Sequence, residues 1–166
     1  MLLNIEKAKK EAGTMFCASF EEIPSCAEFP IEYDIAEPVK VEMEYSYEDE
    51  KLFVRGSFAA KLKVSCGRCL KEFLSEVTGD FAEEFAAQLT DDISYQLTGD
   101  EVELDKLILD SISAQLPARF LCSEDCKGLC PVCGADLNVR SCGCNKKDES
   151  KTTNPFAKLE GLFDNT

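Results

Sequence analysis

The chain has 166 residues, of which 45% are hydrophobic and 30% charged, a composition typical of a soluble globular protein. It contains no histidine, so imidazole-based catalysis and histidine-ligated metal sites are excluded. The net charge of −14 argues against electrostatic binding of bare nucleic acid by the whole chain. No apolar run approaches the roughly 18 residues of a membrane helix. The N-terminus also lacks the charge order of a secretory signal, so we expect a cytoplasmic protein with reduced thiols.

The first part of the chain has the alternation of apolar and polar residues that is typical of antiparallel strands. Residues 29–35, 39–48 and 58–66 each follow this period of two, which gives a strand one buried and one solvated face. The acidic stretch from Thr90 to Glu103 is predicted to be a surface loop. The pattern therefore predicts an antiparallel sheet over the first ~80 residues.

A helix is predicted next, closed by Pro117, with an inward stripe that packs on the sheet. Its stripe consists of Leu104, Leu107, Ile108, Ile112, Gln115 and Leu116. The predicted fold class is α+β, with a mainly antiparallel β-sheet body and a packed helix over residues 1–117. A cysteine-rich, zinc-ribbon-like appendage follows at 118–146, and a polar linker with a short apolar C-terminal tail occupies 147–166.

The appendage contains six of the ten cysteines and too few apolar side chains to fold alone, so metal coordination is the expected source of its stability. Its strongest signal is Cys130-Pro131-Val132-Cys133-Gly134, a tight turn that places two thiolates on one ion. The pair Cys142 and Cys144 begins nine residues later. Together these four cysteines predict a zinc-ribbon-like site.

A second knuckle, Cys66 and Cys69, lies at the tip of a predicted hairpin, and the pair Cys122 and Cys126 follows the helix. These four predict a second tetrathiolate zinc site that pins the appendage to the sheet, although the spacing also permits other pairings of the eight thiols. The two remaining cysteines, Cys17 and Cys26, fit no spacing rule and are interpreted as small buried residues.

Other uses of the thiols are less well supported. Iron is disfavoured because the appendage lacks the aromatic shell of rubredoxin-like sites. A thioredoxin-type dithiol needs a βαβ context that Cys66 and Cys69 lack. No enzyme is predicted, because catalytic zinc keeps an open position and typically uses histidine. The chain also has no phosphate-binding loop and no dinucleotide fingerprint.

Four sequence blocks together resemble the YceD family of large ribosomal RNA subunit accumulation proteins. The blocks are CGRCL at 66–70, LCSEDCKGLCPVCGADLN at 121–138, CGC at 142–144 and NPFAKLEGL at 154–162. Their order and spacing match the cysteine-rich version of the family. The resemblance implies a bacterial, cytoplasmic factor that supports accumulation or processing of 23S rRNA in large-subunit assembly. A neighbouring gene in the family often encodes a small zinc-ribbon ribosomal protein, which suggests a partner.

The charges suggest how such a factor meets a ribosomal particle. Residues 117–158 carry seven Lys and Arg against five Asp and Glu, whereas the rest of the chain carries 11 against 27. An acidic sheet face with Glu42, Glu44 and Glu48 suits a lysine-rich ribosomal protein. Phosphate contacts are assigned to the basic residues of the C-terminal region. They are Arg119, Lys127, Arg140, Lys146 and Lys147.

The expected partners are therefore a pre-ribosomal large-subunit particle, 23S rRNA or a basic ribosomal protein, with no membrane and no small-molecule substrate. The alternative from a different class is a zinc-stabilised protein-interaction or redox-sensing module without a ribosomal role. A ribonuclease is disfavoured, because the sequence offers neither histidine nor a defined carboxylate cluster.

Overall fold

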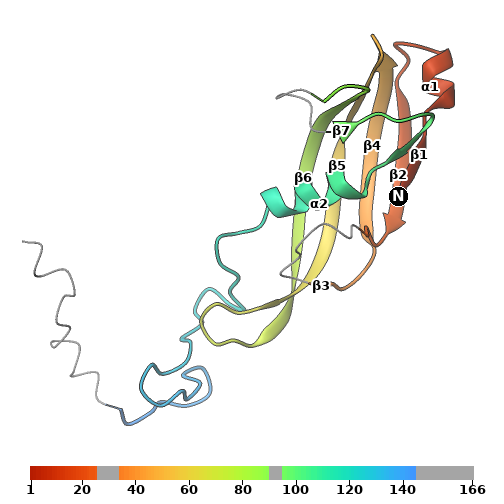
Figure 1. Ribbon diagram of the computed structural model, residues 1–166. Coiled ribbons are helices and arrows are strands. Elements are labelled where there is room, and N and C mark those ends of the chain that lie inside the picture. The colour runs from red at the N-terminus through yellow and green to blue at the C-terminus, as the bar shows by residue number, and fades with distance from the viewer. Residues whose placement is uncertain (26–33, 90–94, 145–166) are drawn as a thin grey trace, which may run out of the picture.

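The computed structural model describes residues 1–25, 34–89 and 95–144 (Figure 1). The elements in chain order are β1 (Leu2–Asn4), α1 (Glu6–Lys10), β2 (Phe16–Glu22), β3 (Asp34–Ile35), β4 (Val39–Glu48), β5 (Lys51–Ser65), β6 (Glu72–Ala86), β7 (Tyr95–Gln96), β8 (Glu101–Glu103) and α2 (Asp105–Ala114). The larger sheet has the order β2-β4-β5-β6-β7, with β3 beside β5, and a small sheet joins β1 to β8. The predicted fold class, a mainly antiparallel sheet with a packed helix, is confirmed.

The centre of the sheet consists of the long strands β4, β5 and β6. Antiparallel pairing joins β5 to β6 along their whole length, from Lys51 opposite Ala86 to Ser65 opposite Glu72. The inward faces predicted for 39–48 and 58–66 are confirmed, except that Tyr47 is only half-buried. The buried side chains on these two faces are Val39, Val41, Met43, Tyr45, Phe58, Ala60, Leu62, Val64 and Cys66.

Helix α2 crosses the inner face of the sheet (Figure 1). Leu104, Leu107, Ile108 and Ile112 are each at most 1% exposed, as helical spacing predicts for a stripe facing a sheet. At the end of the helix, Gln115 lies against β6, where an added Cβ on Gly79 would stand 2.6 Å from its Cγ. Gln115 is itself exposed and is not part of the buried stripe, so a larger residue at Gly79 would have to displace the Gln115 side chain and press on the ring of Phe58.

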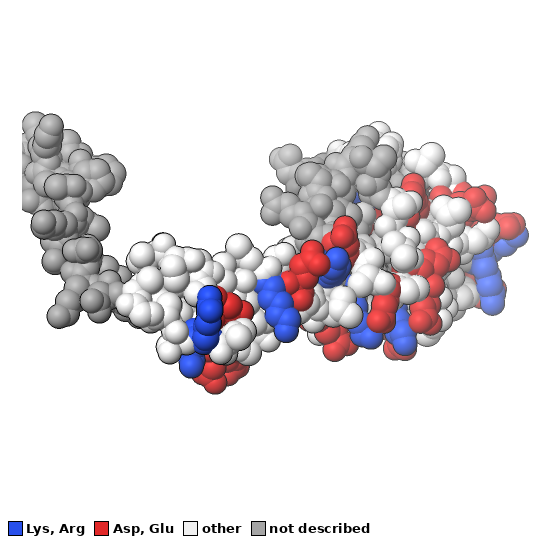
Figure 2. Space-filling view, turned by 90° about the horizontal axis from the view of Figure 1, so that it is seen from below, with Lys and Arg blue, Asp and Glu red and all other residues white. Residues whose placement is uncertain are grey.

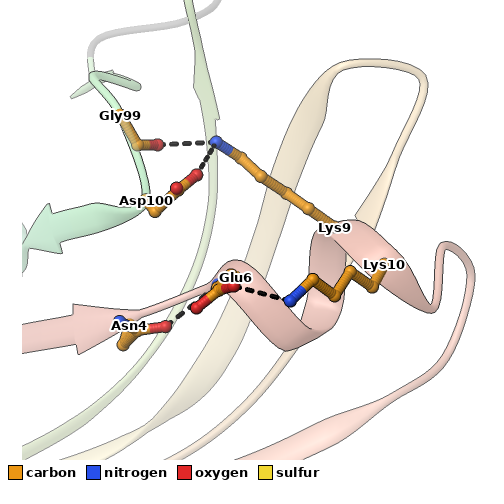
Figure 3. Close-up of polar contacts among 6 residues, drawn as sticks. All are labelled: Asn4, Glu6, Lys9, Lys10, Gly99 and Asp100. Atoms are coloured by element: carbon orange, nitrogen blue, oxygen red, sulfur yellow. Dashed lines mark hydrogen bonds and ion pairs between the residues drawn. The ribbon is translucent and has the colours of Figure 1, made fainter.

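The short helix α1 is fixed to the turn before β8 (Figure 3). The Nζ of Lys9 donates to the carbonyl oxygen of Gly99 and to Asp100, each at 2.7 Å. The backbone N–H of Glu6 donates to the side-chain oxygen of Asn4 at 3.0 Å. These contacts fasten α1 to the ends of both strands of the small β1–β8 sheet.

The prediction of a surface loop over Thr90–Glu103 is wrong in part, because residues 95–103 contain β7 and β8. Tyr95 packs against Phe85 with ring centroids 5.2 Å apart, and Val102 is 2% exposed. Three apolar side chains, Tyr95, Leu97 and Val102, therefore anchor to the core a segment whose remaining residues are polar or glycine. Residues 90–94, like the first part of the predicted strand over 29–35, lie outside the described residues.

The interpretation of Cys17 as buried is also wrong. Cys17 is exposed, because it lies on the outer face of β2, where its register partner across the strands is Glu44. Cys26 lies outside the described residues. Within those residues, no helix has the length and hydropathy needed to cross a membrane.

Candidate metal centres

The first group of four cysteines forms where the β5–β6 hairpin turns. The turn is closed because Leu70 N–H donates to the carbonyl of Cys66, and Cys66 N–H to that of Lys71, both at 2.9 Å. It directs Cys66 and Cys69 toward Cys122 and Cys126, and the four Sγ atoms lie within 4.8 Å of one another. The Sγ of Cys66 is 3.8 Å from that of Cys126, and the Sγ of Cys69 is 3.6 Å from that of Cys122.

Backbone contacts interlock the hairpin turn with the segment that follows α2. The guanidinium of Arg68 donates to the carbonyl of Glu124 at 3.1 Å and to that of Cys126 at 2.9 Å. In return, Leu129 N–H donates to the carbonyl of Arg68 at 3.1 Å. Gly128 has φ +73°, and a Cβ there would lie 2.9 Å from the same carbonyl oxygen. The two segments therefore approach too closely for any residue but glycine.

The second group, Cys130, Cys133, Cys142 and Cys144, is local in sequence and more open. Cys130 is 5% exposed, Cys142 and Cys144 are half-buried, and Cys133 is exposed. The knuckle turn closes because Gly134 N–H donates to the carbonyl of Cys130 at 2.8 Å. These four Sγ atoms also lie within 4.8 Å of one another. The structure thus groups the eight cysteines in the two sets of four that their spacing suggested.

Both groups fit a tetrahedral metal ion. A zinc–sulfur bond of about 2.3 Å places the sulfurs of a tetrahedral site about 3.8 Å apart. The two Sγ separations in the first group, 3.8 and 3.6 Å, are close to this value. None of the nine described cysteines forms a disulfide. Each group can therefore offer four thiolates to one ion and leave no position open for a substrate or water.

In each group, one thiol has a lowered pKa and so ionises more readily than a free cysteine. The pKa of Cys66 is lowered to about 6, first by the backbone N–H of Cys122 and then by that of Cys69. The pKa of Cys130 is likewise lowered to about 6, first by the backbone N–H of Cys133. Hydrogen bonds to a sulfur stabilise its thiolate, which is the form that binds metal.

Another thiol in each group resists ionisation. The pKa of Cys122 is raised to about 12, because it shares a hydrogen bond with the Cys69 sulfur and is removed from water. That of Cys144 is raised to about 12 for the same reasons, with Cys133 as its partner. Several thiolates repel one another at this distance, and a divalent cation removes the repulsion, so metal binding should release protons.

Of the five predicted contact residues, the structure describes three. Arg119, Lys127 and Arg140 are exposed, while Lys146 and Lys147 lie outside the described residues. Figure 2 shows acidic and basic side chains interspersed over the sheet body, and fewer of either kind on the cysteine-rich end. On the sheet, Glu42 and Glu48 are exposed, but Glu44 forms an ion pair with Arg55 at 2.7 Å.

Two residues around the first group were missed by the interpretation of the sequence. Arg68 donates to two backbone carbonyls, and Asn138 donates from its side-chain Nδ2 to the Sγ of Cys126 at 3.5 Å. Arg68 lies inside the Cys66–Cys69 knuckle and Asn138 ends the block at 121–138. Their presence inside cysteine motifs was the available signal, but nothing in the spacing specifies these bonds.

The sheet, the hairpin-borne cysteines and the second knuckle together define a small protein built around two four-cysteine groups. The chain belongs to the YceD family, described as large ribosomal RNA subunit accumulation protein YceD, whose match covers residues 54–163. It is a cysteine-rich member of that family, because both groups of four lie inside the matched region.

Similarity to individual relatives covers shorter stretches. A chloroplastic YCED homolog 1 of Arabidopsis thaliana is 34% identical over 59 residues, 36% of this chain and 18% of that protein. Its Zea mays counterpart is 31% identical over 74 residues, 44% and 24% of the two chains. An uncharacterized protein of Mycobacterium tuberculosis is 32% identical over 95 residues, 53% and 46% of the two chains. This chain thus spans less than half the length of each of these relatives. No solved structure matches it with statistical significance.

Proposed function

We propose that this protein is a non-enzymatic factor in ribosome biogenesis that supports the accumulation or processing of 23S rRNA during large-subunit assembly in the bacterial cytoplasm. The observation that carries the proposal is the family match over residues 54–163, whose description names large ribosomal RNA subunit accumulation. The closed cysteine groups agree with a non-enzymatic role, because structural metal sites use all four positions for protein ligands.

The proposed cofactor is zinc, with two structural ions per chain. Cys66, Cys69, Cys122 and Cys126 would hold one, and the second group the other. Four thiolates are a typical ligand set for structural zinc, and zinc supplies folding energy there without redox chemistry. The chain's own contribution is to exclude water from Cys66 and Cys126 and to donate backbone N–H groups to the sulfurs. Metal analysis of the purified protein should give two zinc ions per chain.

We further propose that the protein contacts its particle through two surfaces. Glu42 and Glu48, which form no ion pair within the described part of the chain, suit a basic ribosomal protein. Glu44 contributes less, because Arg55 already offsets its charge. The exposed Arg119, Lys127 and Arg140 suit phosphate of the large-subunit rRNA.

The test is depletion of the protein followed by measurement of 23S and 16S rRNA and of ribosomal particles on sucrose gradients. The proposal expects a selective loss of 23S rRNA with accumulation of its precursors. Rescue should succeed with the natural chain and fail with Cys66→Ser/Cys69→Ser. Charge reversal at Glu42 and Glu48, or at Arg119 and Arg140, should weaken association with large-subunit precursors. An unchanged ratio and profile would reject the ribosomal role and favour the redox or interaction module.

A further inference from the structure

Asn138 connects the two cysteine groups. It lies between Cys133 and Cys142 in the sequence of the second group, yet its side-chain Nδ2 donates to the Sγ of Cys126 in the first group at 3.5 Å. We propose that Asn138 couples the two metal sites, so that metal in the second group raises the affinity of the first group for its own ion. The inference rests on the proposed zinc binding and concerns how that binding is organised.

The side-chain amide of Asn138 is held from both ends. Its Oδ1 accepts the backbone N–H of Lys127 at 2.7 Å, next to the ligand Cys126. The Oδ1 of Asp136 accepts both the backbone N–H and the side-chain Nδ2 of Asn138, each at 2.8 Å. The amide therefore has one orientation, with its nitrogen on the sulfur and its oxygen on the backbone.

The second knuckle sets the position of this amide. Cys130 N–H donates to the carbonyl of Ala135 at 2.8 Å, and Leu137 N–H to that of Gly128 at 2.9 Å. Between them, Leu129 and Asp136 form an antiparallel bridge. Residues 127–130 and 135–138 are thus paired around the turn that contains Cys133. A metal ion that clamps Cys130 to Cys133 would stabilise this hydrogen-bonded turn, and the turn places Asn138 opposite Lys127.

The expected effect follows from the chemistry of metal-bound thiolates. An N–H donor to such a sulfur offsets its charge and fixes its direction, and loss of such a partner typically costs about 10–100-fold in metal affinity. If opening the second knuckle withdraws Asn138, the first group loses the same donor. Coupling of this kind is reciprocal, so metal in the first group must favour the second to the same degree.

The experiment is a chelator competition on the full chain, with cadmium as the probe, because NMR of the metal can resolve the two sites. Four proteins are compared: the natural chain, Asn138→Ala, the pair Cys142→Ser/Cys144→Ser, and the combination of these changes. Val139→Ala is the matched control, since Val139 is the next residue and is 80% exposed. Asn138→Asp tests the donor itself, because it keeps the size of the side chain and removes the N–H.

The proposal expects Asn138→Ala and Asn138→Asp each to lower first-group affinity by about tenfold, and Val139→Ala to leave it unchanged. The cysteine pair variant should lower it by a similar factor, and adding Asn138→Ala should then lower it less than about twofold further. An unchanged affinity in Asn138→Ala, or two effects that multiply, would overturn the coupling.

Two further outcomes keep the result interpretable. If the cysteine pair variant loses the circular dichroism signal of the sheet, the test rests on Asn138→Ala alone. Reciprocity requires that Asn138→Ala also lower the metal affinity of the second group. An unchanged second-group affinity would then overturn the coupling. If the natural chain binds no metal in either group, the zinc proposal and the coupling fail together, whereas two bound ions with no effect at Asn138 reject only the coupling.

Discussion

A continuous cluster of aliphatic and aromatic side chains fills the sheet body, whereas among residues 121–144 only Cys126, Gly128 and Cys130 are buried. The body can therefore draw its stability from removing apolar surface from water. The cysteine-rich segment cannot, and its backbone hydrogen bonds alone contribute little net free energy. One short chain can therefore be stabilised by apolar burial in one region and by metal coordination in another. Metal removal should affect the cysteine-rich segment, and a core cavity should affect the sheet body.

Metal removal should have the largest effect and should be confined to the cysteine-rich segment. Structural zinc contributes about 10–16 kcal/mol of apparent folding free energy in zinc-finger peptides. With a strong chelator, amides of the segment such as Leu129 and Leu137 should therefore exchange rapidly, while those of β4 and β5 remain protected. Hydrogen exchange with mass spectrometry provides the measurement. If the amides of the segment stay protected without metal, the segment does not depend on metal for its stability.

The reverse perturbation is a cavity in the body. Ile112 is completely buried on the inner face of α2, so Ile112→Ala should lower the free energy of unfolding by about 2–5 kcal/mol. Ile112→Val is the graded control and should cost about 0.5–1.5 kcal/mol. Urea unfolding followed by circular dichroism measures both. Metal stoichiometry should stay at its natural value, and a loss of bound metal in the valine variant would show that the two regions are not independent.

A smaller effect is expected at the contact between β7 and α2. The hydroxyl of Tyr95 donates to Asp110 at 2.9 Å, so Tyr95→Phe should cost about 1 kcal/mol at neutral pH. Burial, followed by the hydrogen bond to Asp110, raises the pKa of Tyr95 above its ordinary value of 10.0. Because folding favours the neutral phenol, this stabilisation is complete below that pH and declines as the pH rises further.

The measurement is the difference in unfolding free energy between the natural chain and Tyr95→Phe across this pH range. Tyr47→Phe serves as the matched control for removal of a phenol hydroxyl from a half-buried position. A difference that grows above pH 10 would contradict the assignment of the raised pKa to folding.

The smallest effect should come from the outer face of the sheet. Arg55 pairs with Glu44 at 2.7 Å, but their side chains are 65% and 45% exposed. Arg55→Gln should therefore change the free energy of unfolding by less than about 1 kcal/mol, and less again in high salt. Lys40→Gln is the control, since its pair with Glu21 is longer, at 3.8 Å. Urea unfolding at two salt concentrations tests this, and a loss above about 2 kcal/mol would give the outer face a structural role.

The same contrast explains what could be predicted from the sequence. Strands with a period of two and the stripe of α2 were predictable, because burial of one face is written into consecutive side chains. Strands β7 and β8 were not, since they depend on Phe85 and on the register of Leu3 with Val102, which are distant in sequence. The exposure of Cys17 likewise depends on which face of β2 meets solvent.

Within the cysteine-rich segment, residue spacing indicated which thiols could share a metal ion. It did not indicate which side chains form hydrogen bonds around them. Knuckles three positions apart constrain two sulfurs to one side of a turn, so spacing indicated two groups of four but also permitted other pairings of the eight thiols. The amide of Asn138 and the guanidinium of Arg68 reach their partners through loop geometry that no period encodes. Whether each group holds zinc remains a prediction for metal analysis.

The β5–β6 hairpin also has a consequence for the order of events during synthesis. Cys66 and Cys126, which meet at the first group, are 60 residues apart in sequence, whereas Cys130 and Cys144 fall within one short stretch. Ribosomes release the N-terminal part first, and contacts between distant residues form slowly because long loops must close. Cys66 and Cys69 at the hairpin tip therefore lack their two partner thiols until α2 and the segment after it have been synthesised. We expect the ion of the first group to bind only after Cys122 and Cys126 have emerged and met the hairpin, so metal supply acts late in the maturation of the chain.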